Sequence, residues 1–198
     1  MQNQGLMKEL ILSLCCLPGI GPKSAQRIAF HLLQRNREGG IKLSKILEQA
    51  MLNIQHCSEC RTLSEAALCE ICSNLNRDDS LLCIVESPAD TWIIDQATAF
   101  KGKYFVLHGR LSPLDGIGPD QIGMSKLEHR MQNSKITEII LATNSTVEGQ
   151  ATAHFIGEVA AKYQIRTTRI AHGIPMGGEL EFIDSSTLSH AFNGRKEI

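Results

Sequence analysis

The architecture of this chain follows from Leu82-Cys83-Ile84-Val85-Glu86-Ser87-Pro88-Ala89-Asp90, an apolar run that ends in a glutamate and passes into a helix start. The apolar residues favour a buried strand, and a proline after Ser87 suits the first turn of a helix. Ligands of open α/β sheets gather beyond the carboxyl ends of the strands. Glu86 is therefore the first candidate for a functional side chain.

Similar pairs of strand and helix recur through the rest of the chain. The strand-like segments are short apolar runs at 81–85, 104–107, 139–142 and 165–170. The helical patterns between them lie near residues 88–98, 123–132 and 149–163. This alternation predicts a mostly parallel sheet covered by helices.

A second strand also ends in polar residues, within the segment 139–151. Asn144, Thr146 and Glu148 follow the strand and enter a glycine-containing turn before a helix. Together with residues 82–90, this segment resembles the Toprim domain of topoisomerases and primases. Enzymes of that type hold Mg²⁺ with the strand-end glutamate and a paired Asp-x-Asp, whose positions are occupied here by Asn144 and Thr146.

These two residues argue against an enzyme. Mg²⁺ prefers anionic oxygen ligands, and an amide with a hydroxyl replaces two aspartates poorly. The acidic residues that remain, Glu86, Asp90 and Glu148, are too few for a two-metal site. We therefore expect no catalytic residue, and we expect Glu86, Asp90, Asn144 and Glu148 to form a docking surface for a basic partner protein. For Asp90, an ordinary helix-capping role explains the sequence equally well.

Four of the seven cysteines form two matched pairs, Cys57-Ser-Glu-Cys60 and Cys69-Glu-Ile-Cys72. Each pair supplies two thiolates from one tight turn, and two such turns complete the tetrahedron that zinc prefers. All four ligands come from the protein, which predicts one structural zinc per chain; a redox pair or unrelated buried thiols are the alternatives. The other three cysteines lie among apolar residues and are expected to be small core residues: Cys15, Cys16 and Cys83.

The N-terminal block, to about residue 56, has helical periodicity. Its clearest turn lies within residues 17–25, where Gly19 and Gly21 permit positive φ and Pro22 suits the start of the next helix. That helix is expected to bury Ala25, Ile28, Ala29, Leu32 and Leu33. A later apolar stripe predicts one long amphipathic helix through Leu43, Ile46, Leu47, Ala50, Met51 and Ile54.

The turn before the second helix is a candidate DNA-binding site. A helix N-terminus after a tight turn presents free backbone N–H groups that suit a phosphate, and Lys23 and Arg27 add positive charge beside Gly19 and Gly21. The segment resembles the helix-hairpin-helix motif, which binds the DNA backbone without recognising base sequence. A plain helical hairpin is the alternative. A P-loop is excluded, because neither required glycine position holds a glycine.

Charge is unevenly distributed along the chain. Residues 1–56 carry seven Lys or Arg and three Glu, whereas residues 57–198 carry 13 basic and 18 acidic side chains. This distribution suits a polyanion at one end and a protein or a metal at the other. No apolar stretch approaches the length of a membrane span, and the N-terminus lacks signal-peptide features, which predicts a cytoplasmic protein with reduced cysteines.

These patterns predict a mixed α+β and α/β fold with a short helical tail. The expected parts are a helix-hairpin-helix region at 1–56, a zinc finger at 57–72, a Toprim-like domain at 80–175 and a C-terminal segment at 176–198.

Two loops complete the set of motifs: Leu111-Ser-Pro-Leu-Asp-Gly-Ile-Gly-Pro119 and Gly177-Gly-Glu-Leu-Glu181. In this order and at this length, the motifs resemble the RecR family of bacterial recombination proteins over almost the whole chain. The resemblance implies a recombination mediator of the RecF pathway that works with RecO and RecF to load RecA on gapped single-stranded DNA, independently of RecBC. It further implies sequence-independent binding of single- and double-stranded DNA, a homodimer or ring-shaped homotetramer, and association with the bacterial nucleoid during repair.

The chain departs from the family pattern at His108, Arg110, Ser145 and Gln150, which alters details of the docking surface. Two other functional classes compete with a mediator. One is a small primase-, nuclease- or topoisomerase-like enzyme, which requires metal-dependent strand chemistry. The other is a zinc-dependent scaffold, which requires that the protein does not bind DNA at any salt concentration.

Overall fold

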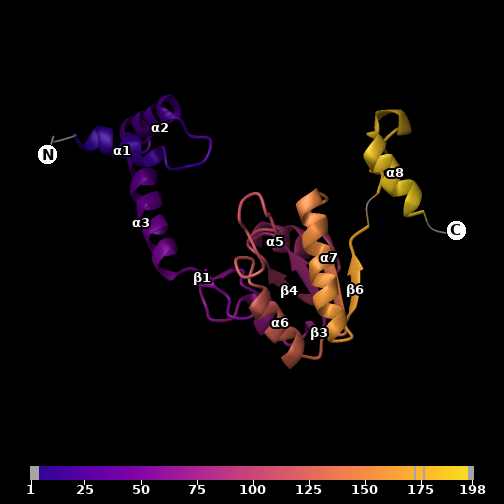
Figure 1. Cartoon of the computed structure of the whole chain (residues 1–198). Helices are drawn as coiled ribbons and strands as arrows, with labels where there is room; N and C mark the ends of the chain where they lie inside the picture. The colour runs from indigo at the N-terminus through magenta and orange to yellow at the C-terminus, as the bar shows by residue number, and fades with distance from the viewer. Residues whose placement is uncertain (1–4, 172, 176, 196–198) are drawn as a thin grey trace. The chain divides into compact units, whose positions relative to one another are not determined.

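The computed structural model describes residues 5–171, 173–175 and 177–195. The chain divides into two compact units, Met1–Ile54 and Gln55–Ile198, and most of their elements are labelled in Figure 1. The C-terminal segment expected at 176–198 is thus described from residue 177 to residue 195, and its remaining residues lie outside the described part.

The first unit consists of α1 (Leu6–Leu14), α2 (Pro22–Arg35) and α3 (Arg37–Asn53). Helix α2 packs against both α1 and α3, with Ala25 and Ala29 completely buried. The expectation for Leu33 was wrong, since this side chain is 37% exposed. At about 100° per residue, Leu33 lies at the flank of the stripe that Ala25 and Ala29 define.

Helix α3 is longer than the sequence pattern predicts. It begins at Arg37, because the Asn36 side chain caps it by accepting a 3.0 Å hydrogen bond from the Gly39 N–H. Its apolar stripe is exposed at Leu43, Ile46, Leu47 and Met51. The helical block ends before residue 56, because Gln55–His56 forms strand β1.

The second unit begins with a small cysteine-bearing subdomain. Strand β1 (Gln55–His56) pairs antiparallel with β2 (Leu63–Ser64), and α4 (Glu70–Ser73) follows. Neither strand was expected, since a pair of two-residue strands has no recognisable hydrophobic period. We call residues 55–74 the zinc subdomain below.

A four-stranded parallel sheet forms the centre of the second unit, as predicted. Its strands are β3 (Asp78–Val85), β4 (Gly102–Val106), β5 (Glu138–Ala142) and β6 (Arg166–Arg169), in the order β4-β3-β5-β6. The sheet is covered by α5 (Pro88–Ala97), α6 (Met124–Asn133) and α7 (Val147–Lys162). All three helices lie within two residues of their expected bounds.

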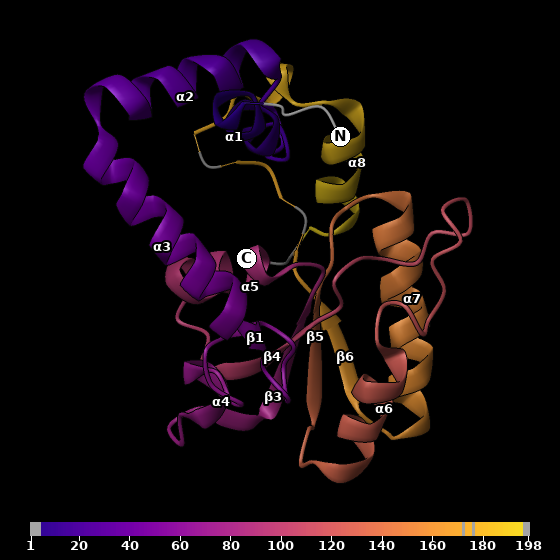
Figure 2. The ribbon, with the colours of Figure 1, turned by 90° about the vertical axis from the view of Figure 1, so that its left-hand side faces the viewer.

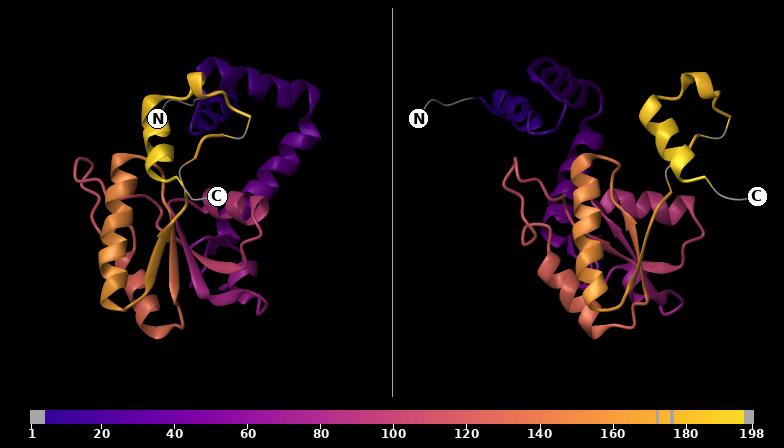
Figure 3. Two further views of the ribbon diagram at one scale, coloured as in Figure 1. Left: turned by 90° about the vertical axis from the view of Figure 1, so that its right-hand side faces the viewer. Right: turned by 45° about the vertical axis from the view of Figure 1, so that its right-hand side comes forward.

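The two faces of the sheet have different cores. Helices α6 and α7 cover one face (Figure 2) and pack their apolar side chains on Leu82, Ile84 and Phe105. Helix α5 covers the other face (Figure 3), where Cys83 and Tyr104 are buried. Of the three extra cysteines, Cys83 is buried as expected, Cys15 is half-buried, and Cys16 was wrongly assigned to the core because it is exposed.

The C-terminal segment contains the 3₁₀ turn η1 (Leu180–Phe182) and α8 (Ser185–Asn193), which confirms a short helical tail. Asp184 caps α8 by accepting a 2.9 Å hydrogen bond from the Thr187 N–H. Among the residues that the structure describes, no helix has both the length and the apolar character needed to cross a membrane.

Candidate functional site

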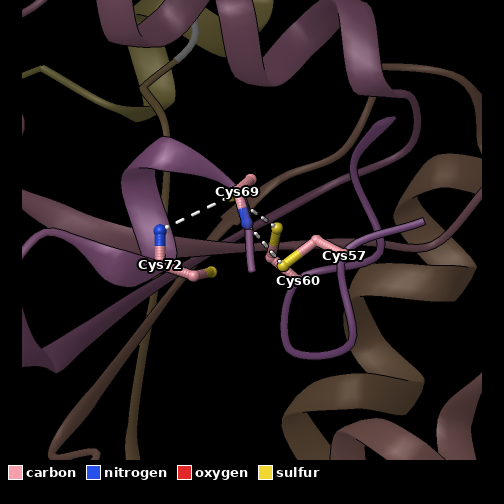
Figure 4. Close-up of side chains that lie close together, drawn as sticks. All are labelled: Cys57, Cys60, Cys69 and Cys72. Atoms are coloured by element: carbon pink, nitrogen blue, oxygen red, sulfur yellow. Dashed lines mark hydrogen bonds between the residues drawn. The ribbon is translucent and has the colours of Figure 1, made fainter. Parts of the chain in front are cut away.

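Four cysteine side chains converge in the zinc subdomain (Figure 4). Their Sγ atoms all lie within 4.8 Å of one another, and all four residues are buried. The Sγ atoms of Cys60 and Cys69 are 3.5 Å apart. Cys69 begins α4, and its Sγ accepts a 3.4 Å hydrogen bond from the Cys72 N–H, while its own N–H donates to Cys57 Sγ at 3.3 Å.

This cluster fits a zinc ion. Zn–S bonds of about 2.3 Å in a tetrahedron place the sulfur atoms about 3.8 Å apart, which agrees with the compact arrangement of the four thiols. The hydrogen bond between the Cys60 and Cys69 thiols lowers the pKa of Cys69 and raises the pKa of Cys60. Because four protein sulfurs fill the coordination shell, the metal is structural, with one zinc per chain.

The zinc subdomain is held on the sheet by its first cysteine turn. The Val106 N–H donates to the Cys60 carbonyl at 2.9 Å. Arg61 Nη1 donates to the Ile122 carbonyl at 2.6 Å, and the guanidinium carbon lies 5.5 Å from the centre of the Phe105 ring. Burial lowers the pKa of Arg61. These contacts join the zinc subdomain to the α/β core.

His108 connects the same turn to the carboxyl edge of the sheet. Its Nε2 lies 2.6 Å from the Arg61 carbonyl oxygen, and its ring lies 4.6 Å from the ring of His56. Burial lowers the pKa of His108. The next residue, Gly109, donates its N–H to the Glu86 carbonyl at 3.0 Å. A continuous path therefore runs from the zinc subdomain to Glu86.

Glu86 directly follows β3, and its carboxylate forms hydrogen bonds within the fold. The residue is 7% exposed. Oε1 accepts a 2.8 Å hydrogen bond from the Asn144 backbone N–H, and Oε2 accepts one of 2.7 Å from Asn144 Nδ2. Arg110 Nη1 lies 3.9 Å from Oε2. Glu86 thus ties the end of β3 to the turn after β5.

The turn after β5 is closely packed against Glu86. Thr146 Oγ1 caps α7 by accepting a 3.1 Å hydrogen bond from the Gly149 N–H. A Cβ on Gly149 would collide with the Asn144 carbonyl oxygen and lie 3.0 Å from Glu86 Oε1, so only glycine fits there. Glu148 is half-buried in the first turn of α7, where the helix dipole favours an acidic side chain.

Asp90 belongs to a capping box at the start of α5. Its Oδ2 accepts a 2.8 Å hydrogen bond from the Ser87 N–H, and its own N–H donates to Ser87 Oγ at 3.3 Å. The helix-capping interpretation of Asp90 is therefore confirmed. Glu86, Asp90 and Asn144 line one hollow of 400 Å³ together with His108. Glu148 lies outside this hollow.

The candidate DNA-binding turn lies in the first unit. Gly19 has a φ of 77°, whereas Gly21 has a φ of −84° and precedes Pro22 as the N-cap of α2. Of the two glycines that permit positive φ, only Gly19 adopts it. Within the described chain, the backbone N–H groups of Lys23 and Ser24 have no hydrogen-bond acceptor. Lys23 and Arg27 are exposed on the same helix.

Known domain families match along the whole chain. The matches are a RecR helix-hairpin-helix domain at 7–51, a RecR four-cysteine zinc finger domain at 54–74, a Toprim domain at 80–171 and a RecR C-terminal domain at 173–196. The protein named "Recombination protein RecR" from Methylococcus capsulatus is 56% identical over 198 residues, which is 100% of both chains. The chain belongs to the RecR family. This membership gives it a role in DNA repair and recombination.

The residues that join the zinc subdomain of this RecR-family chain to its Toprim domain were not predicted from the sequence. Arg61 follows a zinc ligand and adopts a positive φ of 64°, for which no local signal exists. Arg130 lies 26 residues from Tyr104, to whose carbonyl its Nη1 donates at 2.8 Å. Only the folded chain brings these groups together.

Proposed function

We propose that this chain is a non-catalytic recombination mediator that binds DNA through α2 and acts with RecO and RecF to promote RecA loading on gapped single-stranded DNA. The observation that carries the proposal is the open N-terminus of α2, where the free Lys23 and Ser24 N–H groups lie on the same helix as exposed Lys23 and Arg27 side chains. Such a group of donors binds phosphate independently of base sequence, on single- and double-stranded DNA.

A non-catalytic role is supported by the hydrogen bonds of Glu86. In an enzyme of the Toprim type, this carboxylate would bind a metal beside a pair of aspartates. Here both of its oxygens accept hydrogen bonds from Asn144, and Thr146 caps α7. Metal binding at this position would require breaking these bonds and would still offer a single carboxylate.

The same edge is proposed as the docking surface for a basic protein, which we infer to be RecO. Asp90, Asn144 and Glu148 supply its polar surface, and buried Glu86 positions Asn144. Acidic groups repel DNA phosphates and attract a basic protein surface, which mainly sets the encounter rate and the specificity. RecF is the second proposed partner, and RecA is reached indirectly.

Self-association into a dimer or a ring-shaped tetramer is supported by the apolar stripe of α3. Leu43, Ile46, Leu47 and Met51 are all more than half exposed, and a helix face of this kind is stabilised by burial against a second copy. We infer a cytoplasmic protein that associates with the nucleoid during repair.

The DNA-binding part of the proposal is tested with the variant Lys23→Glu/Arg27→Glu. Binding to duplex and single-stranded oligonucleotides should weaken for all base sequences, and the salt dependence for duplex DNA should decrease by about 0.9 log unit per lost phosphate contact. RecA loading on gapped DNA should fall in parallel. The charge-matched control is Lys42→Glu/Lys45→Glu on α3, which should keep the wild-type salt slope. An unchanged slope in the α2 variant excludes the assignment.

The two competing classes give different results with purified wild-type protein. Mg²⁺-dependent cleavage, relaxation or primer synthesis that is abolished by Glu86→Ala would establish an enzyme. A chain that never retains DNA, even at low salt, would be a scaffold. For the docking edge, Glu148→Lys should reduce RecO binding while zinc content remains that of the wild type and the chain stays folded, with a melting temperature lowered only by the lost helix-dipole interaction.

A further inference from the structure

A basic groove lies between the zinc subdomain and α6. Its volume is 830 Å³. One wall contains residues at the amino ends of the strands, namely Asp79 of β3, Lys103 of β4 and Lys135 just before β5. Because the strands are parallel, this edge is opposite the one that carries Glu86. The groove is therefore separate from the hollow beside Glu86.

The groove differs in charge from the rest of its domain. Residues 57–198 carry 13 basic and 18 acidic side chains. The charged residues that line the groove show the reverse balance, with two acids, Glu59 and Asp79, and four bases, Lys103, Lys126, Arg130 and Lys135.

Of these four bases, Lys103 and Arg130 lie close to carboxylates, whereas the charges of Lys126 and Lys135 are available for a ligand. Lys103 lies 2.5 Å from Asp79, and Arg130 Nε lies 3.9 Å from Glu59. In the described part of the chain, neither Lys126 nor Lys135 has a carboxylate within 4.0 Å. Both are exposed, so each presents an accessible ammonium group at the groove.

The shape and lining of the groove determine which anion fits. Lys126, His129, Arg130 and Asn133 follow one another at helical spacing and line the α6 wall. The zinc subdomain forms the facing wall and contributes Leu68, which is 40% exposed. The groove thus combines positive charge with an accessible apolar side chain.

We propose that this groove binds an extended acidic peptide segment of a partner protein, with carboxylates at Lys126 and Lys135 and an apolar side chain against Leu68. A nucleic acid fits less well. No phenylalanine, tyrosine or tryptophan lines the groove, so unpaired bases would have only the smaller His129 ring and the Arg130 guanidinium for stacking. The carboxylates of Glu59 and Asp79 would also repel phosphates, whereas a peptide can place its amide N–H groups there. This function goes beyond DNA binding and docking at the Glu86 edge.

The test uses the full-length, zinc-loaded chain and a fluorescein-labelled peptide of aspartates with one central leucine. Fluorescence anisotropy should show binding that weakens with salt, and a peptide with asparagine in place of aspartate should not bind. Lys126→Glu/Lys135→Glu should weaken binding by about tenfold or more, which corresponds to about 1.4 kcal/mol. The charge-matched control Lys101→Glu/Lys162→Glu, outside the groove, should bind as the wild type does.

The alternatives are separated by the same variants. Equal peptide affinity in the groove variant and the control would overturn the proposal. A second outcome would also overturn it. In this outcome the peptide does not bind, and Lys126→Glu/Lys135→Glu, introduced into the Lys23→Glu/Arg27→Glu variant, reduces binding of a single-stranded oligonucleotide. The groove would then bind nucleic acid. Zinc content and circular dichroism establish that each variant is folded.

Discussion

Asn144 Nδ2 donates a 2.7 Å hydrogen bond to Glu86 Oε2, and the Asn144 backbone N–H donates to Oε1 at 2.8 Å. An aspartate at position 144 would instead place a second negative charge against a carboxylate that is 7% exposed. Two carboxylates at such a distance do not both ionise unless a cation lies between them. The Asn144 amide therefore gives the Glu86 carboxylate a hydrogen-bond donor at the position where an aspartate would need a metal ion between the two carboxylates.

Restoring the paired aspartates should make the stability of the chain depend on magnesium. We expect Asn144→Asp/Thr146→Asp to lower the free energy of unfolding by about 1–3 kcal/mol without metal, because a buried hydrogen bond is replaced by charge repulsion. Added Mg²⁺ should raise the melting temperature of this variant by binding to the folded state. Differential scanning calorimetry with and without Mg²⁺ measures both effects.

Thr146→Asp alone is the control for this experiment. Aspartate is as good an N-cap as threonine, and the bond between Asn144 and Glu86 remains, so its melting temperature should not respond to Mg²⁺. If the wild type were stabilised by Mg²⁺ as strongly as the double variant, the site would already bind metal and the argument from Asn144 would be wrong.

Loss of one zinc ligand should release the metal and destabilise the second unit. Cys57→Ser removes one of four buried thiolates, and metal binding free energy contributes directly to the folding of such a segment. Zinc per chain, measured by atomic absorption, should fall from one towards zero, and the melting temperature should decrease. The exposed Cys16 gives a matched control, since Cys16→Ser should keep both values. Metal-free wild-type protein that melts normally would exclude a structural zinc.

The Arg61 side chain should be important for stability although it is not a zinc ligand. Arg61→Ala leaves the Ile122 carbonyl without its 2.6 Å donor and should lower the free energy of unfolding by about 1–3 kcal/mol. Gly123→Ala should act at the same place, because a Cβ there would collide with the Arg61 guanidinium. Arg166→Ala, at an exposed ion pair with Glu138, should change stability by less than about 0.5 kcal/mol. Urea denaturation distinguishes these outcomes, and equal effects of Arg61→Ala and Arg166→Ala would exclude the proposed role.

The parts of the fold that could be predicted are those with a local pattern. The strand around residues 82–85, the paired cysteines and the proline at the first position of α2 each depend on neighbouring residues, so their types and spacing are sufficient evidence. The position of Asn144 after β5 also indicated that it would lie near Glu86, because parallel strands end at one edge of the sheet.

The parts that could not be predicted depend on contacts between distant residues. Arg61 and Ile122 are 61 residues apart, and no sequence period connects them. The basic groove brings together the zinc subdomain, α6 and the amino ends of three strands. The burial of Leu33 was predicted wrongly because an apolar residue at a stripe's flank is indistinguishable in sequence from one at its centre.

The two glycines of the α2 turn should separate stability from DNA binding. Gly19 has a φ of 77°, so Gly19→Ala forces a left-handed conformation and should destabilise the first unit by about 1–2 kcal/mol. Gly21 has a φ of −84°, and an added Cβ meets nothing within 4 Å. Gly21→Ala should therefore lower stability by less than about 1 kcal/mol.

The effect of Gly21→Ala on DNA should exceed its effect on stability. The new methyl group would add bulk to the turn that precedes the free Lys23 and Ser24 N–H groups, and we expect it to hinder the approach of a phosphate. We expect weaker duplex binding with an unchanged salt slope, since both cations remain. Anisotropy titrations at several salt concentrations and thermal melts measure these quantities. A Gly21→Ala variant that binds DNA as tightly as the wild type would show that the phosphate does not contact this turn.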